Sequence, residues 1–340
     1  MRATIRDIQN ITQLSLSTIS KYINGGNVRD KNRVILDDAI RQLDFKANHF
    51  ARGLKSNRSH TIGVLVPRFD SQFFTALISY IEDEMRRFGY GIIVCGSRNS
   101  IDGEREALEF LINKKVDGLF VIPISNEGRH LLQCEQEKIP VVLIDNLVDD
   151  YETDGVVINN RQISRDIVKE CLNYGHKHIG LITGESLGIY TLKCRCAGYE
   201  DALTAHGIPV DSSMIGMVPP TVAGGYEGLQ EIIRDAPHCT AVFCTNYDMT
   251  LGALMAINEM NKKIGSDFSL FGFDCVELFD SISPKLTMVN QPMKEIALKA
   301  TALLLGRLHD ETDEGSCSVV TLRASIRHGE SICDLRRHDS

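Results

Sequence analysis

Hydrophobic residues along most of this chain form short runs, and longer amphipathic stretches separate these runs. The first series of runs falls at residues 62–66, 92–95, 119–122 and 141–144, and a second falls at 179–183, 214–217, 241–244 and 270–273. Short buried strands that alternate with helices are typical of parallel sheets covered on both faces. The pattern therefore predicts two successive series of βαβ units, which meet near residues 156–161.

The first 45 residues instead show the spacing of three short helices. Thr4-x-x-Asp7 can cap a first helix, whose apolar positions are Ile5, Ile8 and Ile11. After a polar break at Thr12-Gln13, Ser15 can be the N-cap of a second helix over 16–23. A third helix, over about 30–43, places Leu36, Ile40 and Leu43 inward. Two short helices separated by about four residues form a helix-turn-helix.

The second helix of a helix-turn-helix lies in the major groove of DNA, where residues near its N-terminus contact base edges. Leu16 and Ser17 hold these positions, while Thr18, Ser20 and Lys21 are placed to contact phosphates or bases. The alternative is a three-helix structural subdomain with a solvated basic face. Spacing alone leaves both interpretations open.

Charge divides the chain unevenly. Residues 1–60 carry 11 Lys and Arg against 5 Asp and Glu, a net of +6. The remaining residues carry 26 against 40, a net of -14, so the total of -8 conceals a basic head on an acidic body. This division indicates that the head contacts a polyanion and that the body has another role.

Composition limits the class of protein. The 340 residues are 43% hydrophobic, enough for sizeable packed cores in about two domains. The sequence contains neither an uncharged apolar run of 18 residues nor an N-terminal secretory signal. Ten cysteines without a repeating spacing are typical of free thiols in a reducing compartment. We therefore expect a cytoplasmic protein with no membrane partner.

Several motifs carry a family resemblance. They are Thr4-Ile5-x-Asp7-Ile8, Ser15-x-Ser17-Thr18-Ile19-Ser20-Lys21-x-Ile23-Asn24, Val28, Ala47-Asn48-x-x-Ala51-Arg52-Gly53-Leu54 and Ile62-Gly63. Together they resemble the start of the lac-repressor (LacI/GalR) family of bacterial regulators, and the match continues through nearly the whole chain. Gln9 and Gln13 depart from the family, because they replace small residues after the first helix and in the turn.

The resemblance implies a fold class and a domain organisation. An all-α helix-turn-helix head at 1–47 and a hinge helix or linker at 48–60 would precede a core at 61–340. This core would be a two-lobe, periplasmic-binding-protein-like α/β body with doubly wound parallel sheets, which binds an effector and dimerises. Because late segments cross back between the lobes, lobe 1 would comprise about 61–159 plus 290–320. Lobe 2 would comprise about 160–289 plus 321–340.

The hinge is too short to be a stable isolated helix, yet it can fold when two copies pack together on DNA. By resemblance, Leu54 is the wedge that opens the minor groove at the centre of a palindrome, and Lys55 contacts this groove. The alternative for Leu54 is a linker residue that packs on its own core. The other DNA-contact candidates, besides those of the second helix, are Thr4, Ser15, Asn24, Asn48, Ala51 and Arg52.

Ligands of doubly wound sheets bind beyond the carboxyl ends of the strands, here facing the cleft between the lobes. Polar side chains at such ends, a family-like arginine pattern (Arg195-x-x-Gly198-Tyr199) and an aromatic ring supply the effector-binding candidates, which are Phe73, Asp145, Arg195, Asn246, Asp274 and Gln291. Carboxylates and amides suit a polyhydroxyl ligand, whose hydroxyls both donate and accept. Each polar candidate could instead be a strand-end cap, and Phe73 and Phe74 could instead be core residues.

Two departures from the family fall near the expected pocket. Asn246-Tyr247 stands where the family has an Asn-Asp pair, and Asn159 stands where it has an aspartate. These substitutions indicate a less acidic site.

These features predict a dimeric transcriptional repressor that binds palindromic operator DNA and responds to a sugar or sugar derivative. A stand-alone small-molecule-binding protein is one alternative. An esterase that uses Gly184-x-Ser186-x-Gly188 as a nucleophile motif is another, less favoured one. His176-Lys177-His178 lacks the paired spacing of zinc motifs, so a structural histidine is the better interpretation. We expect no enzyme activity, cofactor or metal.

Overall fold

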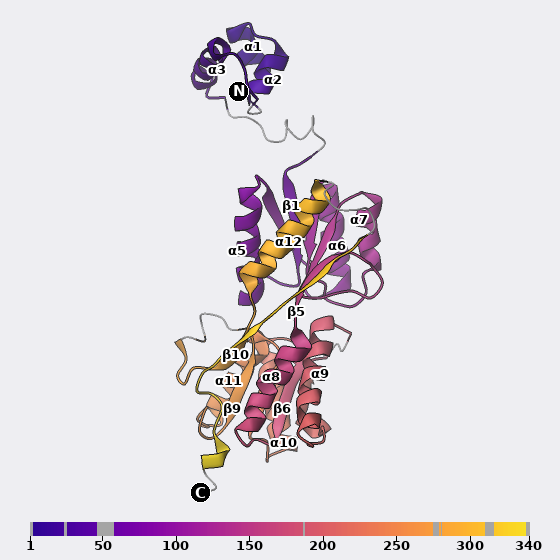
Figure 1. Ribbon diagram of the computed structural model, residues 1–340, viewed down its shortest axis with the longest axis vertical. Coiled ribbons are helices and arrows are strands. Elements are labelled where there is room, and N and C mark those ends of the chain that lie inside the picture. Colours follow the sequence, from indigo (N-terminus) through magenta and orange to yellow (C-terminus); the bar gives the residue numbers. More distant parts are fainter. Residues whose placement is uncertain are drawn as a thin grey trace. The chain divides into compact units, whose positions relative to one another are not determined.

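Figure 1 shows the computed structural model, which describes residues 3–23, 26–45, 58–185, 188–274, 279, 281–309 and 316–337. The chain divides into two compact units, Met1–His60 and Thr61–Ser340. Each unit has its own hydrophobic core.

Three helices form the first unit. They are α1 (Ile5–Thr12), α2 (Leu16–Ile23) and α3 (Asp30–Gln42), packed around Ile8, Ile19, Leu36 and Ala39. Both predicted caps are present. The Thr4 backbone N–H donates to the Asp7 carboxylate over 2.7 Å, and the Thr18 N–H donates to the Ser15 hydroxyl over 3.2 Å. Such caps supply partners for N–H groups that the first turn of a helix leaves unpaired.

Gln13 forms the turn between α1 and α2. Its φ of 56° and ψ of 19° are left-handed, a conformation that disfavours residues with a Cβ. Its backbone N–H donates to the Gln9 carbonyl and its side-chain amide donates to the Asn10 carbonyl, both over 2.8 Å. These two bonds stabilise a turn for which the family resemblance predicts a small residue.

The apolar face predicted for the first helix is only partly correct. Ile8 is fully buried, whereas Ile11 is 46% exposed. Each step of three residues falls about 60° short of a full helical turn, so Ile11 points roughly 120° away from Ile5.

The second unit begins with a six-stranded sheet in the order β11-β5-β4-β3-β1-β2, in which all neighbours are parallel. Its strands are β1 (Thr61–Val66), β2 (Gly91–Gly96), β3 (Gly118–Val121), β4 (Val141–Ile144), β5 (Asp154–Ile158) and β11 (Val319–Leu322). Helices α5 (Gln72–Arg87) and α12 (Met293–Leu308) pack together on one face, and α6 (Ile101–Asn113) and α7 (Leu132–Gln136) cover the other (Figure 1). We call this sheet and its helices the first lobe.

The second lobe repeats this plan with a sheet in the order β12-β10-β9-β8-β6-β7. Its strands are β6 (Ile179–Gly184), β7 (Ile215–Val218), β8 (Ala241–Cys244), β9 (Ser269–Phe273), β10 (Thr287–Asn290) and β12 (Ser325–Arg327). The short β12 is antiparallel to β10, and the other neighbours are parallel. Helices α8 (Asn160–Asn173) and α9 (Tyr190–Ala205) pack as one pair, and α10 (Val222–Asp235) and α11 (Tyr247–Glu259) as another.

The chain passes between the lobes three times. It leaves the first lobe after β5, returns between β10 and α12, and leaves again between β11 and β12. One hydrophobic cluster includes residues of both sheets, among them Val64 and Val156 of the first and Ile179 and Phe243 of the second. Residues 156–158, which the pattern assigned to the junction, instead belong to β5, and the chain crosses directly after them.

The structure thus confirms the predicted fold class of a helical head followed by two doubly wound parallel sheets. Among the helices that the structure describes, none combines the length and the apolar composition that a membrane span requires.

Candidate functional site

A cavity of about 370 Å³ lies where the carboxyl ends of the strands in both sheets meet. All six predicted effector-binding residues line it: Phe73, Asp145, Arg195, Asn246, Asp274 and Gln291. Asp145 directly follows β4, Asn246 begins α11 soon after β8, Asp274 directly follows β9, and Gln291 directly follows β10. The parallel strand order therefore gathers side chains that are far apart in the sequence, as expected for such sheets.

Arg195, on the second turn of α9, is held from several directions. Its Nε donates to Asn160 Oδ1 over 2.8 Å, and its Nη1 donates to the Thr245 carbonyl over 2.6 Å. The guanidinium lies 3.9 Å from the centre of the Phe273 ring. Its Nη2 is 3.7 Å from Asp145 Oδ1, so it forms an ion pair with an aspartate of the other lobe. The planar fork of arginine allows all these contacts at once.

Two buried aspartates end strands in the left-handed conformation. Asp145 has φ 66° and Asp274 has φ 69°, values that cost backbone energy in residues other than glycine. Burial raises the pKa of Asp145 to about 6, against the opposing charge of Arg195 and with a further increase from Asp274. Burial also raises the pKa of Asp274, although Arg195 and the bonds from Gln291 and Tyr247 lower it. Both groups are therefore easier to protonate than an exposed aspartate.

The amide candidates also have structural partners. Gln291 donates its Nε2 hydrogen to Asp274 Oδ1 over 2.6 Å, while its Oε1 is buried without a hydrogen-bond partner. Asn246 accepts the Met249 N–H through Oδ1 over 2.8 Å and so caps α11. The cap that was an alternative to ligand binding at Asn246 is thus present, and the residue lines the cavity as well.

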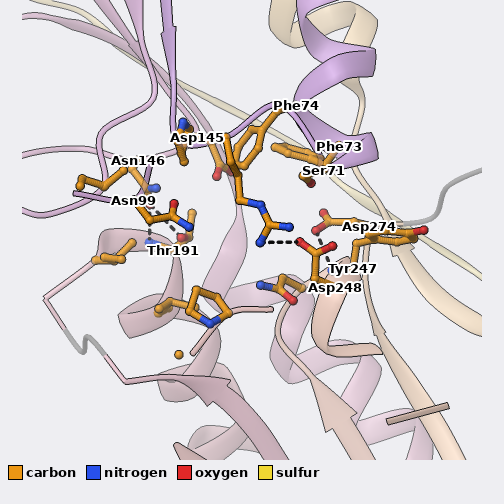
Figure 2. A pocket seen from close by; sticks show the side chains of 18 of the residues that line it. Ser71, Phe73, Phe74, Asn99, Asp145, Asn146, Thr191, Tyr247, Asp248 and Asp274 are labelled. Atoms are coloured by element: carbon orange, nitrogen blue, oxygen red, sulfur yellow. Dashed lines mark hydrogen bonds and ion pairs between the residues drawn. The ribbon is translucent and has the colours of Figure 1, made fainter. Parts of the chain in front are cut away.

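Aromatic rings from α5 form one wall of the cavity. Phe73 is 5% exposed and packs edge-on against Phe74, with 5.3 Å between the ring centres. Figure 2 shows both rings between Asn146 and Thr191 on one side and Asp248 and Asp274 on the other. Phe74 also packs against the main core, as its alternative interpretation proposed, so it contributes to both core and cavity.

Sequence reasoning missed two contacts that join the lobes across the cavity. Asn146 of the first lobe accepts through Oδ1 from the backbone N–H and hydroxyl of Thr191 in α9, over 3.1 and 2.8 Å (Figure 2). Arg68 of the first lobe forms an ion pair with Asp248 of α11, with Nη1 3.7 Å from Oδ2. A sequence signal for Asn146 and Arg68 existed, because each follows a first-lobe strand by two residues.

The two departures from the family do not leave the cavity without acidic groups. Asp248, one residue beyond the Asn246-Tyr247 pair, lies in the lining together with Asp145 and Asp274. Asn159 does not belong to the described lining, because its Oδ1 accepts the Ala324 N–H over 2.8 Å and so holds the segment that crosses between β11 and β12.

His176 has the structural role that the sequence suggested. Its Nδ1 bonds Thr240 Oγ1 over 2.8 Å, and its Nε2 lies 3.0 Å from both the Cys333 carbonyl and Ser269 Oγ. Burial lowers the pKa of His176, and the bond to the Cys333 carbonyl raises it, with burial the larger effect. The histidine thus ties the C-terminal segment to the second lobe.

In the head, Ser15, Leu16, Ser17 and Thr18 lie at the N-terminus of α2, Ser20 and Lys21 lie further along this helix, and Thr4 is the N-cap of α1. Leu16 is 46% exposed, and Ser15, Ser17 and Lys21 are exposed as well. Thr18 and Ser20 are half-buried, and Thr18 Oγ1 lies 2.8 Å from Ser15 Oγ. The hydroxyl of Thr4 donates to Asp7 over 2.7 Å. Six other candidates lie outside the described residues, namely Asn24, Asn48, Ala51, Arg52, Leu54 and Lys55. Ser186 of the esterase motif also lies outside them.

A three-helix head with a helix-turn-helix and a two-lobe core around a polar cavity define the class of periplasmic-binding-protein-like regulators. Residues 59–308 match the sequence model of a family described as periplasmic binding proteins and sugar binding domain of LacI family. The chain belongs to this LacI family.

Similar proteins are transcriptional regulators. Catabolite control protein A of Priestia megaterium is 29% identical over 96% of this chain and 99% of its own. The HTH-type transcriptional repressor PurR of Pasteurella multocida is 31% identical over 92% of this chain and 94% of its own. Because the family is one of regulators, the esterase interpretation is set aside, and the chain is not an enzyme.

Solved structures agree with this assignment. A LacI family transcriptional regulator from Enterococcus faecium with bound ribose has a TM-score of 0.73 and 26% identity, and the match covers 81% of this chain and 99% of that one. The lac repressor dimer bound to operator has a TM-score of 0.86 over 98% of this chain and 100% of that one. Its identity of 20% limits this likeness to the fold.

Proposed function

We propose that this chain is a cytoplasmic, homodimeric repressor whose affinity for a palindromic operator is controlled by a sugar or sugar derivative. The observation that carries the proposal is the cavity at the strand ends of both lobes, bridged by Asp145–Arg195, Asn146–Thr191 and Arg68–Asp248. A ligand there contacts both lobes at once, so its affinity differs between arrangements of the lobes. It therefore favours the arrangement that it binds most tightly. Such a difference is what coupling to DNA requires.

The proposed DNA-binding surface begins at residues 1–47 and continues into the hinge at 48–60. Leu16 and Ser17 would contact bases from the N-terminus of α2, with Ser15, Thr18, Ser20 and Lys21 nearby, and Leu54 would act as the minor-groove wedge. The basic charge of these residues supports this role. A solved dimer of the lac repressor carries operator DNA, and its fold is like this one.

The effector is proposed to contact the polar groups of the cavity and to stack on Phe73. Carboxylates and amides together with an aromatic face suit the hydroxyls and the C–H face of a sugar. The bound ribose in the Enterococcus faecium relative supports this chemistry.

Arg195 provides the test. A thermal-shift screen of sugars, sugar derivatives and nucleobases on the full chain identifies the ligand, because saturation of a native-state site raises apparent stability. Fluorescence anisotropy on a palindrome selected from random DNA then measures operator affinity with and without it. We expect Arg195→Lys to weaken ligand binding at least about tenfold, because lysine keeps the charge and loses the fork. Operator binding without ligand should persist.

Arg161→Lys is the matched control. Its fork contacts Asp201 on the surface, with Arg161 Nε 2.7 Å from Asp201 Oδ2, and it lies outside the described cavity lining. This variant should behave as the wild type. A ligand response that survives in Arg195→Lys would remove Arg195 from the site, and failure to select any palindrome with salt-dependent binding would refute the regulatory function.

A further inference from the structure

An ion pair joins Arg68 and Asp248 in the cavity, so the negative charge of Asp248 offsets the positive charge of Arg68. Arg68 follows β1, and Asp248 lies in the first turn of α11. Their side chains are 19% and 10% exposed, so water screens their attraction less than it would on the surface. Arg68 also donates to Asp70. Two carboxylates thus face one guanidinium.

The second arginine of the lining is engaged as well. Arg195 donates to Asn160 and to the Thr245 carbonyl and pairs with Asp145. The charged residues of the lining are therefore two arginines with protein partners and four carboxylates, namely Asp145, Glu185, Asp248 and Asp274. An anionic ligand would enter a cavity whose formal charge is already negative, and this costs free energy at low effective dielectric.

Helix N-termini are the other groups that could bind an anion, because they present free N–H groups. Four helices begin at or near the lining, namely α5, α9, α10 and α11, and in the last three a side chain accepts one N–H group of the first turn. Asn146 accepts from Thr191, Thr221 accepts from Gly224, and Asn246 accepts from Met249. Asp274 additionally accepts from Tyr247 over 3.3 Å. These N–H groups are therefore already used, whereas the N-cap Ser71 of α5, which also lines the cavity, makes no side-chain cap hydrogen bond.

Acceptors, in contrast, remain available. Asp145 Oδ1 and Gln291 Oε1 are buried without a hydrogen-bond partner, although both residues line the cavity. A buried acceptor without a partner costs free energy, which a ligand hydroxyl recovers by donating to it. The cavity thus requires donors from its ligand, and a phosphate or carboxylate group supplies mainly acceptors.

We propose that Asp248 sets the charge specificity of the cavity: it holds Arg68, so the cavity binds an uncharged polyhydroxyl ligand and excludes its phosphorylated or carboxylated forms. The inference rests on the proposed function, because it concerns the same cavity. Beyond that function, it specifies that the cavity accepts uncharged sugars, and it identifies Asp248 as the residue that excludes anionic ones. Neutralising Asp248 would leave Arg68 paired with Asp70 alone, which lies outside the described lining, and would remove one negative charge from the cavity, so that an anion is repelled less.

The test compares matched ligands on the full chain. Calorimetry and thermal shift are measured with ribose and ribose 5-phosphate, with glucose and glucose 6-phosphate, and with inorganic phosphate. The wild type should bind a neutral sugar at least about tenfold more tightly than its phosphorylated partner. Asp248→Asn should gain at least about tenfold in affinity for a phosphorylated sugar or for inorganic phosphate, and Arg68→Met in the same chain should abolish this gain.

Asp70→Asn is the matched control, because Asp70 also contacts Arg68 but lies outside the described lining of the cavity. It should keep the wild-type preference. If Asp248→Asn does not fold, Asp248→Ser serves in its place. The proposal is overturned if the wild type binds a phosphorylated sugar as tightly as the neutral one, or if removing the Asp248 charge brings no gain for anions. Binding of no neutral sugar would instead count against the proposed effector class, while the phosphate titration of Asp248→Asn still tests charge exclusion.

Discussion

At the scale of single residues, Asp145 shows that the site is built at the expense of stability. Its carboxylate is buried, one oxygen has no hydrogen-bond partner, and its backbone is left-handed. Arg195, at 3.7 Å, compensates for only part of the lost hydration, since burial still raises the pKa of Asp145 to about 6. Such local costs persist where function requires them.

Stability should therefore depend on the ionisation of Asp145. Because the pKa is raised in the folded state from 3.8, the folded protein holds this proton more tightly than the unfolded chain. This contribution is present at low pH and is lost as the pH rises through about 6. We expect the difference in unfolding free energy, Asp145→Asn minus wild type, to grow by roughly 1–2 kcal/mol between about pH 5 and 8. Urea unfolding at several pH values measures it.

Asp201→Asn is the control for this experiment. The bond from Arg161 lowers the pKa of Asp201, so this group titrates below the tested range. Its difference from the wild type should stay flat with pH. A flat profile for Asp145→Asn as well would show that Asp145 does not hold its proton in the folded state. Asp145→Asn should also bind the effector more weakly, since the asparagine amide replaces one acceptor of the carboxylate by a donor.

Single residues of the site differ in how far the sequence predicts them. Asp145 and Asp274 follow clear apolar runs, so strand-end logic finds them without a structure. Asp248 is not found in this way, because it lies in the first turn of a helix, where an acidic residue is common as a helix-terminus charge. Thr191 could not be found at all, because its role depends on the approach of Asn146 from the other lobe.

At the scale of elements, the helix pairs of the second lobe determine where the cavity residues lie. A Cβ at Gly198 of α9 would come within 2.3 Å of the Arg161 carbonyl oxygen in α8. A Cβ at Gly225 of α10 would come within 2.3 Å of the Met249 carbonyl oxygen in α11. The glycines thus allow backbones to approach closely. The α8–α9 contact matters for the site, because Asn160 at the start of α8 bonds Arg195 of α9.

Gly198→Ala should therefore disturb both stability and ligand binding. Alanine gains about 1 kcal/mol in helix propensity, but the backbone oxygen cannot yield as a side chain would, and overpacking typically costs about 1–3 kcal/mol. We expect a net destabilisation and a weaker effector affinity, because α9 must shift and carry Arg195 with it. Thermal unfolding and calorimetry measure the two effects.

Gly91→Ala is the control, since a Cβ there meets nothing within 4 Å and the residue is exposed in β2. It should leave stability within about 0.5 kcal/mol of the wild type. If Gly198→Ala matches this control, the close approach of α8 and α9 is not required for the fold or the site.

Elements also differ in how well the pattern predicts them. Strands such as β1 and β8 are buried on both faces and appear as continuous apolar runs. The strand β11 alternates between exposed and half-buried residues. The sheet to which it belongs depends on where the chain crosses between the lobes for the third time, and the local hydrophobic pattern does not predict this position. For this reason β11 and β12 could be assigned to lobes only through the family resemblance.

At the scale of the whole molecule, the uneven charge limits where DNA can bind. A net of +6 on residues 1–60 attracts phosphates, and a net of -14 on the remaining residues repels them. Operator affinity should therefore fall steeply with salt, because each neutralised phosphate releases a counterion. Because the body is acidic, we propose that DNA contacts only the head and the hinge. Substitution of single lysines in the head and in the body tests this division.

Lys21→Ala should flatten the salt dependence of operator binding. Lys21 is exposed on α2, and one lost phosphate contact lowers the slope of log affinity against log salt by about one for each protomer. Affinity should fall to a similar degree for different operator sequences, because a phosphate contact carries no base information.

The control is Lys299→Ala, on the exposed side of α12 in the acidic body, and it should leave the slope unchanged. Anisotropy titrations from about 50 to 200 mM salt measure both variants. Equal slopes for Lys21→Ala and the wild type would exclude Lys21 from the phosphate contacts, and a loss of affinity confined to one operator sequence would assign it to a base instead.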